Sequence, residues 1–204
     1  MVYPEKWNQQ LEILLNGLLI SYSELKSHEV GNHEFESYIN SVKERFVVKW
    51  TRVNFKFNKH NYCNNIKGKM KIPEGFKIVK IDKNLFQKIS GKVVPKNFWD
   101  SPDHFLKEGI GFCLLNEGTV ISTCFSSWIV DRNLELGIET NEKFRRQGYG
   151  IYPAAALIDY CLENGYEPVW SCNKENISSF KIAQKLGFEV TCYHPHYSLV
   201  KNRI

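Results

Sequence analysis

The clearest hydrophobic pattern in the chain lies between residues 134 and 165. Residues 134–140 (Leu-Glu-Leu-Gly-Ile-Glu-Thr) alternate well enough to predict a half-buried strand. Apolar residues then recur at spacings of four, three and four, which predicts an amphipathic helix; they are Ile151, Ala155, Ile158 and Leu162. The pair Asn164-Gly165 predicts the end of that helix, because both residues tolerate the left-handed backbone conformation that closes a helix.

The pattern upstream predicts further strands and short helices in a regular order. The predicted elements are a strand at 76–81, a helical turn or two at 84–89, a helix that begins at Ser101-Pro102-Asp103, and strands at 111–115 and 119–130. Asn116-Glu117-Gly118 between the last two is a strong hairpin signal. Together with the strand at 134–140, these strands predict an antiparallel meander.

Downstream, the chain predicts a strand at 167–172 and a helix at 173–186 that Gly187 ends. Because a helix joins the strand at 134–140 to the one at 167–172, we expect these two strands to be parallel. Trp128, Trp170, Phe180 and Phe188 are predicted core aromatics. Pro195, between His194 and His196, predicts a bend between two last strands rather than a metal site.

Residues 1–74 give a weaker pattern. Helical spacing of apolar residues predicts helices at 7–25 and 33–46, and asparagines and lysines at 54–71 predict an exposed hairpin or loop. The sequence therefore predicts two parts, a partly helical N-terminal extension at 1–74 and a main domain at 75–204. Two interpretations of the extension stay open: a packing or dimerising segment, or a lid that shapes a substrate site. A homodimer is compatible with the first.

Composition and charge narrow the class of protein. Hydrophobic residues make up 43% of the 204 residues, which is enough for a substantial core. The net charge of +5 is modest and its lysines and arginines are spread along the chain, which argues against nucleic acid as a partner. No signal peptide and no apolar run of ~20 residues is evident, so no membrane partner is expected. The six cysteines form no C-x-x-C pair, which favours reduced cysteines in the cytoplasm over a metal site.

The candidate chemistry begins between the strand at 134–140 and the helix that follows it. Residues 145–150, Arg-Arg-Gln-Gly-Tyr-Gly, bring two arginines and two glycines to a helix N-terminus. Free backbone N–H groups, a close backbone approach and cationic side chains are the features of an anion site. The segment is not a P-loop, because it lacks G-x-x-x-x-G-K-[ST], and it lacks the third glycine of a dinucleotide fingerprint.

This loop resembles the Q/R-x-x-G-x-G/A loop of the GCN5-related N-acetyltransferase (GNAT) superfamily. Asn176 with Ser179 resembles the start of that superfamily's last helix, and residues 183–189 (Ala-Gln-Lys-Leu-Gly-Phe-Glu) resemble its end. The resemblance covers Gly75 to the C-terminus. The segments Ser-Ser-Trp-Ile-Val-Asp and Glu-Leu-Gly-Ile-Glu-Thr are similar to those of a bacterial subgroup whose members are mostly uncharacterised.

The resemblance implies an α+β fold with three layers, in which helices flank a mixed, mostly antiparallel twisted sheet. Two parallel strands splay apart at one end of that sheet and admit the pantetheine arm of acetyl-CoA, whose pyrophosphate lies on the loop. The implied partners are acetyl-CoA, as cosubstrate, and a small amine. The implied cofactor-binding residues are Ile138, Glu139, Thr140, Arg145, Arg146, Gln147, Gly148, Tyr149, Gly150, Asn173, Asn176 and Ser179.

Acetyl transfer to an amine requires removal of the ammonium proton, which a positioned carboxylate performs. Glu135 and Glu139 are the candidate bases, and their even separation places them on one face of the strand. Glu135 is the first candidate, since it lies within one residue of the superfamily's strand-borne base. A solvated carboxylate, or one bonded to a neighbouring turn, is the alternative for each.

One departure from the superfamily concerns the general acid. Many members carry a tyrosine seven residues after the asparagine, where this chain has Ala183. Tyr193 or Tyr197 would have to replace it, although core packing is the expected role of both. The sequence therefore predicts an acetyl-CoA-dependent N-acetyltransferase, with a non-catalytic acyl-CoA-binding or regulatory module as the alternative.

Overall fold

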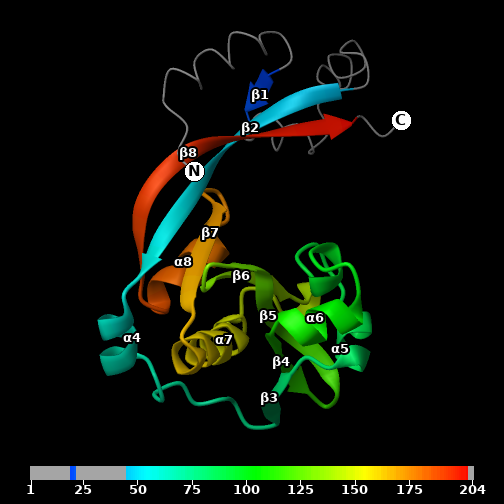
Figure 1. The fold of residues 1–204 in the computed structure, drawn as a ribbon, viewed down its shortest axis with the longest axis vertical. Helices are drawn as coiled ribbons and strands as arrows, with labels where there is room; N and C mark the ends of the chain where they lie inside the picture. Colours follow the sequence, from blue (N-terminus) through cyan, green and yellow to red (C-terminus); the bar gives the residue numbers. More distant parts are fainter. Residues whose placement is uncertain (1–18, 22–44, 202–204) are drawn as a thin grey trace. The chain divides into compact units, whose positions relative to one another are not determined.

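The computed structural model describes residues 19–21 and 45–201 (Figure 1). The chain forms two compact units. Unit 1 comprises Met1–Val53, Cys172–Glu175 and Cys192–Ile204, and unit 2 comprises Asn54–Ser171 and Asn176–Thr191. Unit 2 therefore begins before Gly75, whereas the division into domains at 1–74 and 75–204 stays a prediction.

The described strands form a mixed sheet. Its strands are β1 (Leu19–Ser21), β2 (Arg45–Phe57), β3 (Phe76–Lys80), β4 (Gly111–Asn116), β5 (Thr119–Val130), β6 (Asn133–Thr140), β7 (Glu167–Asn173) and β8 (Phe188–Lys201). Their order is β1-β2-β7-β6-β5-β4-β3, and β8 pairs with β2. The predicted meander is confirmed, because β3, β4, β5 and β6 pair antiparallel, and the predicted parallel pairing of β6 with β7 is confirmed as well.

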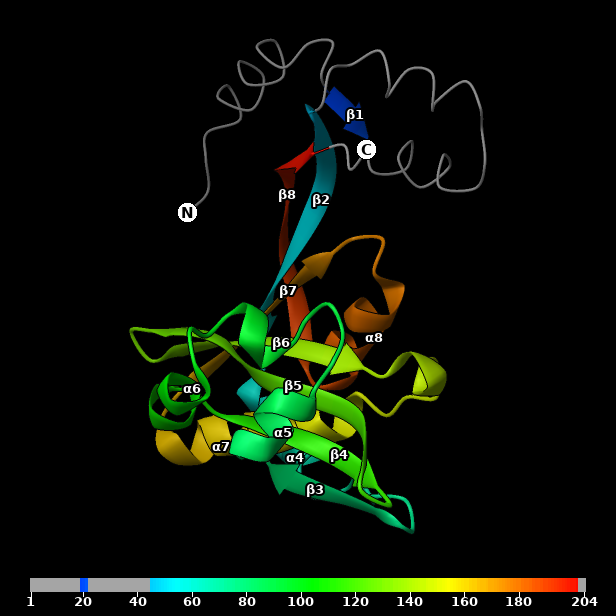
Figure 2. The same ribbon diagram turned by 90° about the vertical axis from the view of Figure 1, so that its right-hand side faces the viewer.

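Helices cover both faces of the meander in unit 2. They are α5 (Lys83–Lys88), η1 (Pro95–Asn97) and α6 (Pro102–Glu108) on one side and α7 (Ile151–Asn164) on the other (Figure 2). Adjacent residues of a strand point to opposite faces. Accordingly, Cys113 of β4 joins a core with Phe86 of α5, whereas the ring of Phe112 lies 6.3 Å from that of Tyr160 on α7.

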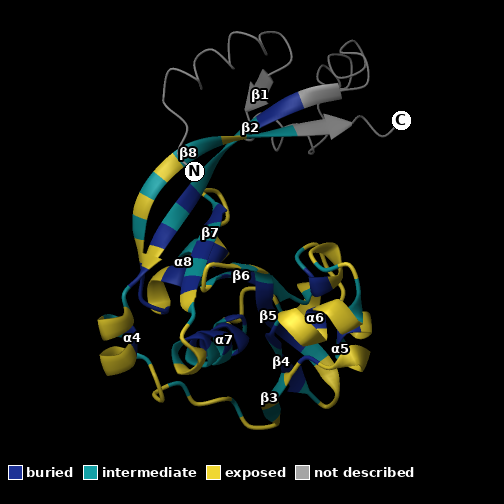
Figure 3. Ribbon diagram, in the orientation of Figure 1, coloured by how far each residue is buried: buried dark blue, intermediate teal, exposed yellow. Residues whose placement is uncertain are grey.

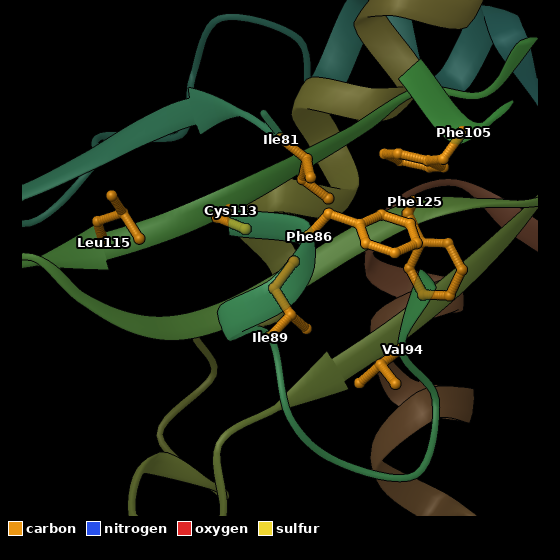
Figure 4. Packing of buried hydrophobic residues seen from close by; sticks show 8 residues of the cluster. All are labelled: Ile81, Phe86, Ile89, Val94, Phe105, Cys113, Leu115 and Phe125. Carbon is orange, nitrogen blue, oxygen red and sulfur yellow. The ribbon is translucent and has the colours of Figure 1, made fainter. Parts of the chain in front are cut away.

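The first core of unit 2 lies between the meander and α5, η1 and α6. Its buried members are Ile81, Phe86, Ile89, Val94, Phe105, Cys113, Leu115 and Phe125 (Figure 4). Ser101 caps α6 by accepting a hydrogen bond from the backbone N–H of His104, as the sequence predicts. Gly165 closes α7 in the left-handed conformation, which is also predicted. Burial is densest along β4 and β5 (Figure 3).

A second core of unit 2 joins aromatic residues of β2, α4, β7 and β8. Phe57 packs against Tyr62 and Phe188, and Phe188 packs against Trp170. Tyr62 lies on α4 (Lys59–Asn65), which Asn58 caps, and its hydroxyl donates to Asp159 Oδ1 of α7 at 3.0 Å. The loop or hairpin predicted at 54–71 is therefore wrong. Asn58 caps a helix, and the one buried residue of that helix, Tyr62, bonds to α7.

Two other predictions about the sheet are also wrong. Residues 19–21 form β1 beside β2, and Arg45–Phe57 is one strand, so the described parts of the helices predicted at 7–25 and 33–46, which are residues 19–21 and 45–46, are strand. The rest of those two helices lies outside the described residues. The predicted bend at Pro195 is absent, because β8 continues through it. Among the described strands β8 pairs with β2 alone, and such an edge tolerates proline.

Along residues 19–21 and 45–201, no helix has the length and apolar character needed to cross a membrane. Four of the six cysteines are buried as free thiols, as predicted: Cys113, Cys124, Cys161 and Cys172. Burial raises the pKa of the Cys113 thiol to about 11 and that of Cys161 to about 12, so both stay protonated at neutral pH.

Candidate active site

The parallel strands β6 and β7 pair at one end only. Asn133, Leu134 and Glu135 of β6 face Glu167, Pro168 and Val169 of β7. By contrast, β5 pairs with β6 as far as Thr140. From residue 136 to residue 140 the other edge of β6 thus has no strand partner among the described residues, which confirms the predicted splay. Backbone groups on such an edge can bond to an extended ligand as they would to another strand.

The loop at residues 145–150 lies directly after this free edge. The 3-10 helix η2 (Glu142–Phe144) follows β6, and α7 begins at Ile151. Within the described part of the chain, the backbone N–H groups of residues 146–150 have no hydrogen-bond acceptor. Arg146 and Gly148 have positive φ angles of 65° and 82°. Successive free N–H groups beside a helix N-terminus form an anion site.

Gly148 leaves the loop open to a ligand. A Cβ atom at this position would meet no atom of the protein within 4 Å. The space beside its backbone is therefore available to an anion, and a side chain there would occupy it. Arg146 is exposed and forms no hydrogen bond or ion pair with another described residue, so its charge is available to the same anion.

The rest of the loop is fixed to the sheet. A Cβ atom on Gly150 would lie 3.0 Å from Cδ1 of Ile138 and 3.4 Å from Oγ1 of Thr140, so the loop packs closely on β6. The ring of Tyr149 stacks on that of Phe76, with centroids 5.1 Å apart. Gln147 is exposed. The structure thus brings together the predicted cofactor residues of β6 and of the loop.

Glu139 holds two loops in place with its carboxylate, which is only 11% exposed. Oε2 accepts hydrogen bonds from the backbone N–H groups of Lys92 and Val93, both at 2.9 Å. Oε1 accepts from the Nη2 of Arg145 at 3.1 Å, and the Nε of Arg145 donates to the carbonyl oxygen of Thr140 at 3.2 Å. Gly91 packs so closely on Glu139 that a Cβ would lie 2.6 Å from Cγ. Both oxygens of Glu139 are therefore engaged in fixing the backbone.

Glu135 has different partners. Its Oε1 accepts a hydrogen bond from the hydroxyl of Ser171 at 2.5 Å, and its Oε2 accepts one from the indole N–H of Trp128. The register of β5 against β6 shifts between Ser126 and Trp128, so Ser127 is an extra residue. Such a bulge redirects the side chain that follows it. The carboxylate thus sits on side-chain donors at the point where β6 and β7 separate.

Three predicted residues lie at or before α8 (Ile177–Lys185). Asn176 caps this helix, since its Oδ1 accepts from the backbone N–H of Ser179 at 3.2 Å. The Ser179 hydroxyl is buried and accepts from the indole N–H of Trp170. Asn173 belongs to unit 1, where its Oδ1 accepts from the N–H of Glu175. A role of these residues in cofactor binding stays a prediction.

Sequence analysis missed Trp128 and Ser171. Trp128 was predicted to be a core aromatic but is 39% exposed, because the bulge at Ser127 takes it out of the alternation. The consecutive serines at 126 and 127 are the one local sign of this break. Ser126 is wholly buried and bonds to the backbone of Ile110. Tyr193, also predicted in the core, is 54% exposed.

No tyrosine occupies the position of the superfamily's general acid. Ala183 fills it and is completely buried. No group of three or more His, Cys, Asp or Glu side chains within residues 19–21 and 45–201 is arranged to hold a metal ion.

Comparison with known proteins places this geometry in a family. A model of the GNAT acetyltransferase family matches residues 22–197. The uncharacterized N-acetyltransferase YdfB of Bacillus subtilis (strain 168) is 32% identical over 137 residues, which cover 66% of this chain and 52% of that protein. The chain thus spans about half the length of this curated relative.

Solved structures share the fold. A GCN5-related N-acetyltransferase-like protein from Streptococcus suis 89/1591 is 26% identical, with a TM-score of 0.65 over 83% of this chain and 69% of that one. A GCN5-related N-acetyltransferase from Kribbella flavida, 16% identical, has a TM-score of 0.52 over 81% and 63% of the two chains. Since the family model covers most of its residues, this chain belongs to the GNAT acetyltransferase family.

Proposed function

We propose that this protein transfers the acetyl group of acetyl-CoA to a primary amine. The observation that carries the proposal is the run of N–H groups at 146–150 without an acceptor in the described structure, next to the free edge of β6. A pyrophosphate fits these donors and the charge of Arg146, and an extended pantetheine arm fits the free edge. Residues 138–140 and 145–150 would hold the cosubstrate, and Glu139 and Arg145 would fix the conformation of the loop.

Acetyl-CoA supplies an acetyl thioester at the splay, and Glu135 supplies the base. An acceptor amine arrives largely as an ammonium ion, and Glu135 takes one of its protons. The neutral nitrogen then forms a bond to the thioester carbonyl carbon, the bond from that carbon to sulfur breaks, and the nitrogen releases its second proton to solvent as the amide forms. A positioned base contributes about 10²–10⁴-fold to such a reaction.

The partners of Glu135 suit this role. Hydrogen bonds from Ser171 and Trp128 fix the orientation of the carboxylate. With Ala183 in place of an acid, the sulfur leaves as a thiolate, which a thiol pKa of ~8.5 permits.

Ala183 also supports a second candidate, a non-catalytic acyl-CoA-binding module. The two candidates differ in thiol release from acetyl-CoA in the presence of small amines, amino acids, polyamines and aminoglycosides. The enzyme releases thiol in proportion to an acetylated amine, whereas a binding module is stabilised by acetyl-CoA without turnover. Absence of any stabilisation at millimolar acetyl-CoA would contradict both.

The state of the cysteines supports a cytoplasmic location. Each of the six cysteines is a free thiol. Unpaired cysteines persist in a reducing compartment, whereas secreted proteins tend to form disulfides. We therefore propose that acetyl-CoA and the amine are met in the cytoplasm.

A further inference from the structure

Two exposed aromatic side chains lie on the face of the sheet that carries Glu135. Residues 135, 137 and 139 of β6 share one face because their spacing is even. A Cβ atom on Gly137 would lie 2.8 Å from the ring of Phe125, a member of the core beneath α5 and α6. Glu135 therefore projects from the same side of the sheet as that core.

Phe98 lies against Phe125 on this face. Its ring meets the ring of Phe125 edge-on, with centroids 5.5 Å apart, and Phe98 is 48% exposed. Its position is fixed by its neighbour, because the indole N–H of Trp99 donates to the carbonyl oxygen of Ser126 at 2.7 Å. An exposed ring on a fixed backbone is available to a ligand without a large cost of ordering.

Trp128 lies directly opposite Glu135, on β5. Its N–H edge is turned to the carboxylate, and its side chain remains 39% exposed. Glu135 pairs with Trp128, and Gly137 pairs with Phe125, against whose ring Phe98 packs. At ~3.4 Å per residue, positions 135 and 137 are about 7 Å apart along β6, which is on the order of the length of a short alkyl chain.

We propose that Phe98, Trp128 and Glu135 form the acceptor patch, and that its ligand is a cationic primary amine with an apolar body. The ammonium group bonds to the Glu135 carboxylate and lies against the Trp128 ring, since aromatic faces attract cations. The apolar body packs on Phe98. An amino acid is disfavoured, because its own carboxylate is repelled by Glu135. This inference rests on the proposed acetyl transfer.

The first test is a chain-length series. The probes are n-alkylamines from methylamine to hexylamine, with glycine as the anionic counterpart, assayed by thiol release at saturating acetyl-CoA. We expect kcat/KM to rise by about threefold for each methylene that Phe98 covers, and glycine to be poorer than methylamine. A series that does not depend on chain length, or a preference for glycine, would overturn the patch.

The second test separates the two roles of Trp128. Trp128→Leu removes the aromatic face, so KM for hexylamine should rise by about 2- to 30-fold while KM for acetyl-CoA is unchanged. Trp128→Phe keeps a face but loses the N–H donor, so it should lower kcat more than it raises KM. Val130→Ala, at an exposed site on the same strand, is the matched control and should behave as the parent.

The third test concerns Phe98. Phe98→Ala should flatten the chain-length series, so that kcat/KM for hexylamine falls towards that for methylamine. The parent and Phe98→Ala could show the same dependence of kcat/KM on chain length while acetyl-CoA still stabilises both proteins. In that case the acceptor patch is wrong, whereas the proposed cofactor site stands. If acetyl-CoA binds to neither protein, the proposed function fails first.

Discussion

The two ends of β6 present the same residue type on the same face and use it differently. At the end where β6 pairs with both β5 and β7, Glu135 accepts hydrogen bonds from a hydroxyl and an indole. At the end where it pairs only with β5, Glu139 accepts two backbone N–H bonds and one from a guanidinium.

The comparison shows that the hydrogen-bond donors around a carboxylate determine what that carboxylate can do. Backbone N–H groups and an arginine hold Glu139 as a cross-link between the loop at 91–93 and the loop that begins at Arg145, and they occupy both of its oxygens. Glu135 instead has side-chain donors, next to an exposed ring. We interpret Glu135 as the base and Glu139 as a positioning residue.

The largest effect is expected for Glu135→Gln. The variant keeps the size of the side chain and loses its basicity, so turnover should fall by roughly 10²-fold at neutral pH. The deficit should shrink as pH rises, because more of the amine is then neutral without help. Initial rates across pH measure this. Glu117→Gln, in the β4–β5 turn, is the matched control, and equal rates for both variants would remove Glu135 from the mechanism.

The next effect concerns the anion site. A ligand at 100 times its dissociation constant stabilises a folded protein by about 2.7 kcal/mol. Gly148→Val should abolish this stabilisation by acetyl-CoA, because the new side chain would occupy the space beside the backbone of the loop. Gly118→Val is matched, since Gly118 also has a positive φ (78° against 82°) and no atom within 4 Å of a Cβ. Melting curves with and without acetyl-CoA distinguish the two. Normal stabilisation of Gly148→Val would mean that the loop is only a turn.

Glu139→Gln should affect stability and cofactor affinity more than chemistry. Its amide presents one acceptor oxygen to three donors, and an unsatisfied buried donor costs about 1–3 kcal/mol. We expect this loss of unfolding free energy in urea, with weaker acetyl-CoA binding. Turnover at saturating acetyl-CoA should fall less than in Glu135→Gln. Glu142→Gln, whose side chain is exposed nearby, is the control. The reverse order of the two kcat losses would make Glu139 the base.

The smallest effect concerns Asp159 on α7. Burial raises the pKa of its carboxyl, and the bonds from Tyr62 and Lys67 only partly offset this. The folded protein therefore holds this proton more tightly than the unfolded chain, whose aspartates titrate near ~3.9. The contribution of Asp159 to the free energy of unfolding is therefore fully present below that pH. It is lost as the pH rises through the pKa that Asp159 has in the folded protein.

Asp159→Asn removes this titration and keeps an acceptor for Tyr62. Its melting temperature should therefore decline less than that of the parent as the pH rises from acid towards neutral. Asp103→Asn, at an exposed ion pair, is the control. A steeper decline in Asp159→Asn than in the parent would show that the ion pair with Lys67 outweighs burial.

Local patterns predicted the meander and the loop correctly, because alternation, turn residues and helix ends are properties of short segments. The hairpin at 116–118 and the cap at Gly165 illustrate this. The helix α4 was missed because its one fully buried residue, Tyr62, finds its partner 97 positions away on α7. The continuity of β8 through Pro195 likewise depends on pairing with β2, which is distant in sequence.

The site was predicted in part for the same reason. The glutamates and the loop at 145–150 are local features, whereas their partners are not. The backbone donors of Glu139 lie 46 and 47 residues away, and Ser171 lies 36 residues from Glu135. A one-residue bulge at Ser127 decides where Trp128 points, and alternation cannot show such a shift.

The most direct test of acetyl transfer is a comparison of products in one reaction. The purified protein, acetyl-CoA and hexylamine are incubated, and free thiol and N-acetylated amine are measured together. We predict equal amounts of both, formed far above the uncatalysed rate, with loss of both in Gly148→Val and retention in Gly118→Val. Stabilisation by acetyl-CoA without an acetylated product, from hexylamine or any other amine in the panel, would contradict the account and identify a binding module instead.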